Sequence, residues 1–493
     1  MARRISGLLL HPTSLPGAGG LGRDAYHFVD FLVDAGCGIW QMLPPSPLGP
    51  GNSPYAARSA FALEPMLISL EQLALDGLLD SRIDFYPATM DVHRHEFGLV
   101  RQHREPLLRA AFKECMAGGG REHLDAFSAD NPWLTGYAAF AALRELSREP
   151  WWLWPVRYHD PAEVPAQEGS ALGDEIRYQQ FLQWSLDRQW RSLRTYARER
   201  GVALYGDVPI FVDLDSADVW ANQRLFKLDA EGRPEVVAGV PPDAFSATGQ
   251  HWGNPHYDWD IMRDDGYRWW IERMRRTFSL FDCVRVDHFR GFESAWEIPA
   301  GSHDAVAGHW AAGPGRELFD AMSAALGRLP IIVEDLGLIT PEVRALRDEL
   351  GYPGMAVLQF AFGDDDSNPY LPHNHIQNEV VFTGTHDNDT TLGWYRSAPE
   401  WDRDHVRRYL SVSGDDIVND LIRCAYHSVA DTALIPMQDV LELGSEGRMN
   451  VPGSASGNWA WRFTWDQLSE GRARWLSDLA HETGRHAALV AAL

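Results

Sequence analysis

The sequence contains eight short apolar runs, each bounded by turn-forming or polar residues. The runs are Ile5–Leu10, Ile39–Leu43, Ala203–Val208, Cys283–Val286, Ile331–Val333, Ala356–Phe360, Val380–Thr383 and Ala433–Met437. Within each run the apolar residues are continuous and do not alternate with polar ones, which is typical of strands buried on both faces. The eight runs therefore predict parallel strands in a sheet that helices cover.

Helical patterns separate several of these runs. Asp24–Ala35 places its large apolar residues on one face and ends before Gly36, and Asp174–Arg200 is followed by Gly201. Thr340-Pro341 is typical of a helix start, and Gly351 of the end of that helix. Strands that alternate with helices imply right-handed crossovers, and eight such units predict an α/β fold, the (β/α)8 TIM barrel.

Two stretches are too long for a simple crossover. Roughly 160 residues separate the second strand from the third, and helical patterns within them, Val100–Gly118 and Tyr137–Ser147, predict a mainly helical subdomain inserted at 65–173. Residues 213–260 are rich in Gly, Pro and Trp and have little periodicity, which predicts a loop-rich insertion. We expect one catalytic barrel domain over 1–493 that carries both insertions.

Charge and cysteine content exclude several classes of protein. With 44 basic and 69 acidic residues the net charge is −25, which disfavours binding to nucleic acid or to an anionic membrane but not to a neutral substrate. The four cysteines are scattered without a C-x-x-C pair, and we find neither a signal peptide nor an 18-residue apolar run. The sequence therefore predicts a cytoplasmic protein.

Three motifs resemble ligand sites without completing them. Gly17–Gly22 matches G-x-G-x-x-G but lacks the acidic residue expected about 20 residues later. Asp364–Asn368 begins like a calcium loop, yet Pro369 and His375 stand where glycine and glutamate are needed. His95-Glu96 fails to complete H-E-x-x-H. None of the three therefore predicts a nucleotide or metal site.

Carboxylates follow four of the predicted strands, where barrel enzymes place their catalytic groups. They are Asp207, Asp287, Glu334 and Asp387. An unpaired charge is costly in a buried strand, so four such exits favour catalysis over structural ion pairs. Arg285 lies two residues before Asp287 and points to the same side of the strand, where it would lower the pKa of that carboxyl and keep it ionised as a nucleophile.

Glu334 would have the opposite task. A raised pKa would let its carboxyl protonate a leaving oxygen. Two carboxyl groups about 5–5.5 Å apart mark a retaining glycosidic mechanism. Asp387 and His386 could bind sugar hydroxyls, and some of the 20 tryptophans could stack on sugar rings, although core packing accounts for most of them.

The segments around these residues resemble the amylomaltases, the bacterial 4-α-glucanotransferases of the α-amylase-like barrel superfamily. The matching segments run nearly from end to end: 7–16, 53–55, 206–212, 237–243, 252–255, 285–291, 333–337, 383–391, 448–450 and 456–462. Single segments are moderately specific, and all of them in order are highly specific.

The resemblance implies a role for each site residue. Asp287 would be the nucleophile, Glu334 the general acid/base and Asp387 the transition-state stabiliser. Arg285 and His386 would contact the sugar at the cleavage point. Further residues would line donor or acceptor subsites: Asp207, Tyr55, Asp243, Trp252 and Asn458. The family needs no known metal or cofactor and lacks the C-terminal β-domain of typical amylases, which agrees with the helical end of this sequence.

The predicted activity is transfer of an α-1,4-glucan segment to the 4-hydroxyl of another glucan or of glucose, with net retention. The partners would be maltooligosaccharides and glucans derived from starch or glycogen. Residues 238–254, with Phe245 and Trp252 as apolar cover, are the candidate lid that excludes water. Two alternatives stay open: an α-glucan hydrolase with the same residues, and a non-catalytic glucan-binding protein. The sequence predicts no oligomeric state.

Overall fold

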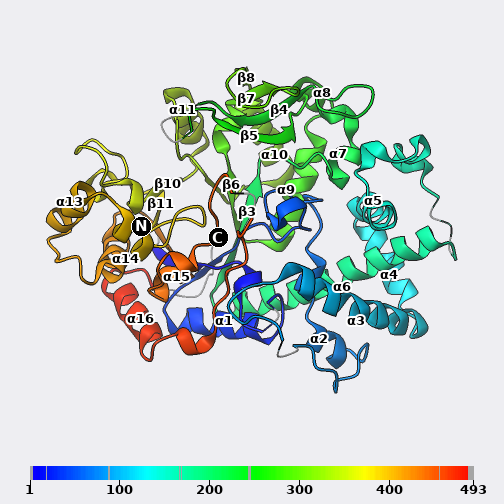
Figure 1. Cartoon of the computed structure of the whole chain (residues 1–493), viewed down its shortest axis with the longest axis horizontal. Helices are drawn as coiled ribbons and strands as arrows, with labels where there is room; N and C mark the ends of the chain where they lie inside the picture. Colours follow the sequence, from blue (N-terminus) through cyan, green and yellow to red (C-terminus); the bar gives the residue numbers. More distant parts are fainter. Residues whose placement is uncertain are drawn as a thin grey trace.

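The computed structural model describes residues 4–17, 19–86, 89–165, 167, 169–242, 246–454 and 456–486. Eight parallel strands form one sheet in the order β10-β11-β12-β1-β2-β3-β6-β9 (Figure 1). Their bounds are β1 (Ile5–Leu9), β2 (Ile39–Gln41), β3 (Ala203–Pro209), β6 (Cys283–Asp287), β9 (Ile331–Val333), β10 (Gly354–Val357), β11 (Glu379–Phe382) and β12 (Thr432–Pro436). The Val333 N–H donates to the Pro353 oxygen at 3.0 Å, so the sheet nearly closes into a barrel between β9 and β10.

All eight predicted strands are confirmed. The sixth is shifted, because Leu358–Phe360 forms a 3-10 turn and β10 starts two residues earlier than expected. The barrel interior is a compact apolar cluster: Ile39, Ala203, Tyr205, Cys283, Ile332, Met355, Val357, Val380, Phe382 and Leu434. The alternate residues of each strand pack outward against helices, which explains why both faces are apolar.

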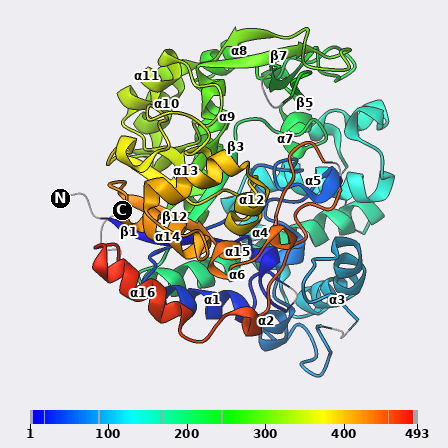
Figure 2. The ribbon, with the colours of Figure 1, turned by 60° about the vertical axis from the view of Figure 1, so that its left-hand side comes forward.

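Helices follow seven of the eight strands. Those that cover the barrel are α1 (Arg23–Asp34), α6 (Ala171–Glu199), α9 (Arg268–Leu280), α10 (Gly315–Leu326), α11 (Pro341–Leu350), α14 (Ile417–His427) and α16 (Arg472–Glu482). Figure 2 shows α1 and α16 side by side below β1 and β12. Between β10 and β11 only 3-10 turns occur, while α12 (Thr391–Ser397) and α13 (Glu400–Leu410) precede α14. The predicted helices around 24–35, 174–200 and 341–350 are confirmed.

The long connection between β2 and β3 is mainly helical. It contains α2 (Leu70–Leu75), α3 (Phe97–Ala117), α4 (Arg121–Asp130) and α5 (Trp133–Ser147), which lie at the right of Figure 1. The last three pack against the 29-residue helix α6. A partly buried ion pair between Arg109 and Glu175, at 2.7 Å, reinforces this contact. The boundaries 65–173 stay a prediction.

The second insertion holds more regular structure than the sequence indicates. Besides α7 (Ala217–Ala221) and α8 (Trp259–Asp264), it contains β4 (Val236–Val240) and β5 (Gln250–Pro255). These strands join β7 (Ser294–Pro299) and β8 (His309–Ala312) in an antiparallel sheet of order β5-β4-β7-β8. The partners β7 and β8 follow β6, so two separate connections build this sheet, which lies at the top of Figure 1. The expectation of a loop-rich 213–260 is corrected to that extent, because its pairing partner lies outside the segment.

After β12 the described residues hold α15 (Met437–Val440), 3-10 turns and α16, and no further β-sheet. Among the residues placed in the structure, every helix is too short or too polar to cross a bilayer.

Candidate active site

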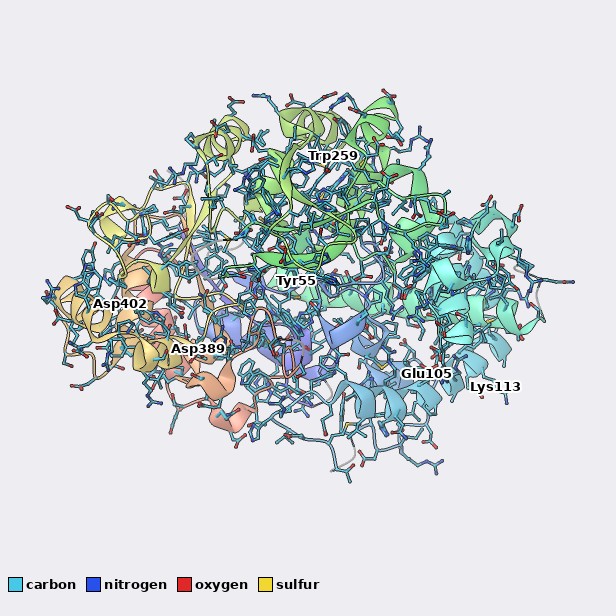
Figure 3. All side chains as sticks on the ribbon, turned by 45° about the horizontal axis from the view of Figure 1, so that its top comes forward. Tyr55, Glu105, Lys113, Trp259, Asp389 and Asp402 are labelled. Carbon is cyan, nitrogen blue, oxygen red and sulfur yellow. The ribbon has the colours of Figure 1, made fainter. Side chains whose placement is uncertain are left out.

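The predicted site residues gather at the carboxyl ends of the barrel strands. Arg285 and Asp287 lie on β6, Asp207 lies on the neighbouring strand β3, and Glu334 directly follows β9 on the other side. Tyr55, from the connection after β2, lies near the centre of the molecule in Figure 3. Segments far apart in the sequence thus meet where the barrel fold requires a catalytic site.

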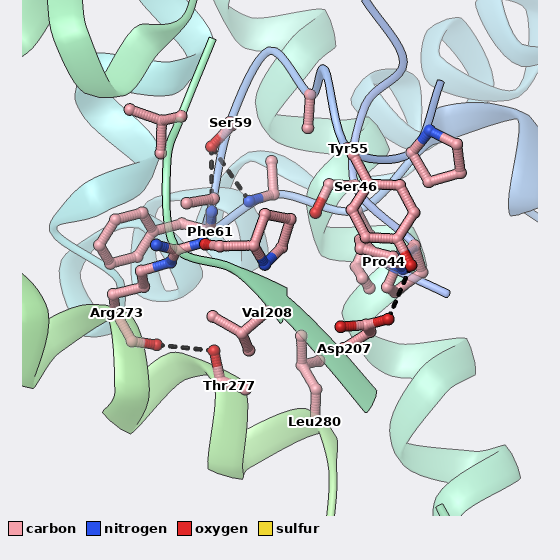
Figure 4. Close-up of a pocket in the computed structure, with 18 of the residues that line it drawn as sticks. Pro44, Ser46, Tyr55, Ser59, Phe61, Asp207, Val208, Arg273, Thr277 and Leu280 are labelled. Atoms are coloured by element: carbon pink, nitrogen blue, oxygen red, sulfur yellow. Dashed lines mark hydrogen bonds between the residues drawn. The ribbon is translucent and has the colours of Figure 1, made fainter. Parts of the chain in front are cut away.

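Arg285 is the centre of the polar network. Its Nη2 lies 2.6 Å from Asp207 Oδ2, 3.0 Å from Asp287 Oδ1 and 3.0 Å from the Tyr55 hydroxyl. Its Nε donates to Asp207 Oδ2 as well, at 3.0 Å. The Tyr55 hydroxyl donates to the same oxygen at 2.8 Å, as Figure 4 shows. The Asp207 side chain is 1% exposed and accepts hydrogen bonds from both Arg285 and Tyr55, so it positions these two residues.

A second set of contacts fixes the segment that carries Tyr55. Asp215 accepts hydrogen bonds from Arg58 at 3.1 Å and from Arg144 of α5 at 2.8 Å. Tyr55 and Asp207 also border a small cavity of about 40 Å³ (Figure 4). The helical insertion is thus connected to the site through a partly buried ion-pair cluster.

The pKa of Asp287 differs from the sequence-based expectation. Burial raises the pKa of its carboxyl, the nearby carboxylates raise it further, and Arg285 only partly offsets both. The expected lowering of this pKa is wrong, because burial outweighs the effect of Arg285, whose shorter hydrogen bond goes to Asp207. The side chain of Asp287 keeps 29% exposure, which leaves an oxygen open to a substrate.

Glu334 lies in a frame of backbone donors. The N–H groups of His288 and Leu336 each donate to one of its carboxyl oxygens at 2.8 Å. Burial raises the pKa of Glu334, while Arg285 and the two N–H donors oppose that rise. The direction agrees with the expectation for this residue. Together Asp287 and Glu334 hold a proton more readily than isolated carboxyl groups do.

Asp387 is the most open of the three carboxylates, with a side chain 49% exposed. Asn450 Nδ2 donates to its Oδ1 at 2.6 Å, and His386 Nε2 lies 3.4 Å from the same oxygen. The Arg448 guanidinium donates to the Asp387 backbone oxygen at 2.9 Å. Sequence reasoning assigned no role to Asn450 and Arg448, although both lie in one of the matching segments, because a loop amide carries no pattern of its own.

An aromatic wall stands beside these carboxylates. The ring of His386 stacks on Tyr55 at 5.2 Å with an interplanar angle of 12°, and Trp459 lies 5.9 Å from Tyr55. Burial lowers the pKa of His386, although Asp387 opposes the change, so the imidazole is neutral at pH 7. A flat wall of this kind next to polar groups suits a sugar ring.

The remaining predicted residues are placed unequally. Trp252, on β5, is 39% exposed and meets the His288 ring edge to face at 4.8 Å. The side-chain amide of Asn458 forms hydrogen bonds within its own loop. Its Oδ1 accepts a hydrogen bond from the Val451 N–H at 3.0 Å, and its Nδ2 donates to the Ser454 oxygen at 3.0 Å. It is therefore not brought to the carboxylates by any described contact. Asp243 and Phe245 lie outside the described residues.

Among the side chains that the structure places, no group of three or more His, Cys, Asp or Glu residues could hold a metal ion. The four cysteines are free, and Cys37, Cys115 and Cys283 are buried. That no cofactor takes part stays a prediction.

A barrel with an arginine and carboxylates at the ends of β3, β6, β9 and β11 defines an enzyme that acts on glycosidic bonds. The sequence profile of 4-alpha-glucanotransferase matches residues 10–468, so the chain belongs to this family.

Relatives support the assignment over the full length. The 4-alpha-glucanotransferase of Thermus thermophilus is 47% identical over 499 residues, which cover 98% of this chain and 99% of that protein. That of Synechocystis sp. is 46% identical over 498 residues, with 98% of both chains covered. An amylomaltase from Streptococcus agalactiae in complex with acarbose has a TM-score of 0.94 and 34% identity, and covers 98% of this chain and 100% of that one. The predicted family and fold are confirmed.

Proposed function

We propose that the chain carries out its family's transfer reaction by double displacement at Asp287. In the first step an Asp287 oxygen attacks the anomeric carbon of an α-1,4-glucan. The bond from that carbon to the glycosidic oxygen breaks, and the Glu334 proton goes to the departing oxygen. The products are a glycosyl ester on Asp287 and a shortened glucan with a free 4-hydroxyl.

In the second step Glu334, now ionised, takes the proton from the 4-hydroxyl of another glucan. That oxygen attacks the anomeric carbon of the ester, and the bond from this carbon to the Asp287 oxygen breaks, which releases Asp287 as a carboxylate. Two inversions give net retention, and one glycosidic bond is formed for each that is broken. Asp387 and neutral His386 bind sugar hydroxyls, and Asp387 supplies negative charge near the oxocarbenium-like transition state.

The observation that carries this proposal is the pairing of Asp287 and Glu334 on adjacent strands. β6 and β9 are hydrogen-bonded neighbours, and both carboxyl groups follow their strands at the same end of the barrel. Arg285 contacts the first at 3.0 Å, and backbone N–H groups hold the second at 2.8 Å. The pKa of both carboxyl groups is raised, so the pair retains a proton, and in the first step that proton lies on Glu334 while the Asp287 oxygen attacks.

Transfer, in contrast to hydrolysis, requires that a sugar and not water reaches the ester. The β4–β5 segment bears Trp252 next to His288 and supports the candidate lid over 238–254. The substrates would be maltooligosaccharides and starch- or glycogen-derived glucans, handled in the cytoplasm. A glucan hydrolase is the second candidate, because it would use the same carboxylates.

Maltotriose as the sole substrate tests the proposal. We expect glucose together with a ladder of maltooligosaccharides longer than maltotriose, separated by size and followed over time. Glucose and maltose with nothing longer would establish a hydrolase and overturn the transfer proposal. No reaction with maltotriose or with longer donors would leave only glucan binding.

A further inference from the structure

His288, the residue after Asp287, has an unusual backbone. Its φ of 51° and ψ of 48° lie in the left-handed region, which residues with a side chain rarely adopt. Such a conformation persists only where the surroundings hold it, and it gathers at functional sites. The strained residue therefore needs an explanation in terms of what it positions.

The left-handed turn directs backbone donors toward the acid/base residue. The His288 N–H points to Glu334 Oε2 at 2.8 Å, and the next N–H, that of Phe289, donates to the Glu334 backbone oxygen at 3.2 Å. With the Leu336 N–H on Oε1, both carboxyl oxygens are held and the plane of the carboxyl group is fixed.

The imidazole is held from several sides. Trp252 of β5 meets it at 4.8 Å and 83°, and Phe211 lies at 6.4 Å. A Cβ on Gly291 would stand 3.2 Å from its Cδ2, so this glycine leaves room for the ring. The ring is buried and neutral, because burial lowers its pKa to about 3. Among the described residues no polar group is hydrogen-bonded to Nε2, so packing keeps His288 in place.

We propose that His288 is a positioning residue for the acid/base carboxyl: its left-handed backbone, locked by the ring packed under Trp252, aims an N–H at Glu334 and fixes the orientation in which Glu334 donates its proton. This inference rests on the role of Glu334 in the proposed function. The four-stranded sheet then helps to orient Glu334, because Trp252, which packs against the His288 ring, belongs to that sheet.

The inference predicts a defect confined to proton transfer. Val strongly disfavours the left-handed region, whereas Asn tolerates it. In His288→Val, turnover of maltotriose, whose leaving oxygen needs a proton, is expected to fall about 30-fold, a part of what general acid catalysis supplies. Fluoride release from α-maltosyl fluoride in the presence of azide needs no proton in either step and is expected to fall less than about threefold. His288→Asn, which tolerates the left-handed region but lacks the ring, should retain more maltotriose turnover than His288→Val.

The pH profile supplies a second readout. An N–H that donates to a carboxylate lowers its pKa, so loss of this donor raises the pKa of Glu334 and moves the basic limb of kcat/KM to higher pH. The other charged or titratable groups that face Glu334 are Arg285, Asp287, Asp335 and Tyr370, and those near His288 are Arg290 and His256. None of these residues is changed in the variants, so a shift of the basic limb is due to the altered N–H donor at position 288.

Ser411→Val is the matched control. Ser411 has a φ of 57° at the end of α13, is exposed and lies outside the site. Its replacement should therefore leave the ratio of maltotriose turnover to fluoride release unchanged. If His288→Val does not fold, the pair His288→Gly and His288→Ala replaces it, since both lack the ring and only Ala disfavours the left-handed region. The glycine variant should then keep more maltotriose turnover.

The inference would be overturned if His288→Val slowed maltotriose turnover and fluoride release equally, or if it left the basic limb of kcat/KM unchanged. Its failure is separable from that of transfer, because fluoride release requires no sugar acceptor. A wild-type enzyme that only hydrolyses maltotriose would refute the transfer proposal and leave the His288 comparison interpretable.

Discussion

Each end of the barrel is built around a buried arginine, and the two arginines have opposite surroundings. Arg285, at the carboxyl end, contacts Asp207, Asp287 and Tyr55. Arg485, at the amino end, is fully buried and donates only to backbone oxygens, those of Ile5, Tyr426, Ser428, Ala430 and Asp431. Its five donors thus have five neutral partners.

The difference separates function from stability. Although burial lowers it, the carboxylates raise the pKa of Arg285 well above its ordinary value, while burial lowers that of Arg485. Asp207 Oδ1 is buried and has no hydrogen-bond partner in the part of the chain that the structure describes, and Asp387 is half exposed, so polar atoms at the carboxyl end stay free to bind a ligand. Every N–H of the Arg485 guanidinium is hydrogen-bonded to the protein. A site that binds and releases sugar needs polar atoms that are free to bind a ligand, whereas an arginine that only stabilises the fold does not.

Replacing the acid/base residue should give the largest effect. Glu334→Gln keeps the shape of the side chain but removes the proton, so turnover of maltotriose is expected to fall about 10³-fold, or about 4 kcal/mol. Glucan binding and the melting temperature should stay near wild type, and the basic limb of the pH profile should vanish. Glu349→Gln on the surface of α11 is the control. A variant that retains its basic limb would show that another group is the acid.

The amino-end clamp can be broken without touching the site. Arg485→Met leaves buried carbonyl groups without donors, and we expect it to lower the free energy of unfolding by about 3 kcal/mol. Activity per folded molecule should be unchanged. Arg408→Met, which removes an exposed ion pair with Asp404, should cost less than about 0.5 kcal/mol. Urea unfolding with parallel rate measurements would test the division, and a lower rate per folded Arg485→Met molecule would contradict it.

Two loop asparagines sharpen the comparison within the active end. Asn450→Ala removes the 2.6 Å donor to Asp387, so kcat should fall about tenfold with little change in melting temperature. Asn458→Ala opens a loop contact and should change kcat less. The reverse order would support the sequence-based role of Asn458 in substrate binding and contradict the structural account of Asp387.

The smallest effect concerns charge at the amino end of β11. Burial raises the pKa of Glu379 from 4.5 to about 7. The folded state therefore disfavours the ionised form, so stability is fully present below pH 4.5 and is lost as the pH rises through 7. Glu379→Gln should be more stable than wild type at pH 8 by about 1 kcal/mol, and this difference should disappear at pH 4. Urea unfolding at both pH values measures it, and a gain independent of pH would point to packing instead.

The barrel and its site were predictable because their signals are local. Continuous apolar runs marked all eight strands, and a carboxylate after a strand marked Asp287 and Glu334. The four-stranded sheet was missed because β4 pairs with β7, across the whole of α9 and β6, and no local pattern records that partner. The lowered pKa expected for Asp287 was wrong for a similar reason, since the sequence shows neither the burial of this carboxyl nor that Asp207 competes for Arg285.

Residues that act through the backbone were also hidden. His288 reads as a polar residue after a nucleophile, and its left-handed conformation depends on space left by Gly291 and on a tryptophan from another sheet. Asn450 and Asn458 are indistinguishable as loop amides, and only their partners separate them.

The four-stranded sheet imposes an order on synthesis. Its central pair, β4 and β7, flanks the nucleophile strand in the chain, so during translation β4 and β5 emerge first and β7 only after Asp287 has been made. The sheet whose strand β5 places Trp252 against the His288 ring is therefore complete only once Asp287 has been made. For the same reason neither the β3–β6 connection nor the β6–β9 connection can be deleted or exchanged alone between related chains, since each would leave half a sheet with an unpaired edge.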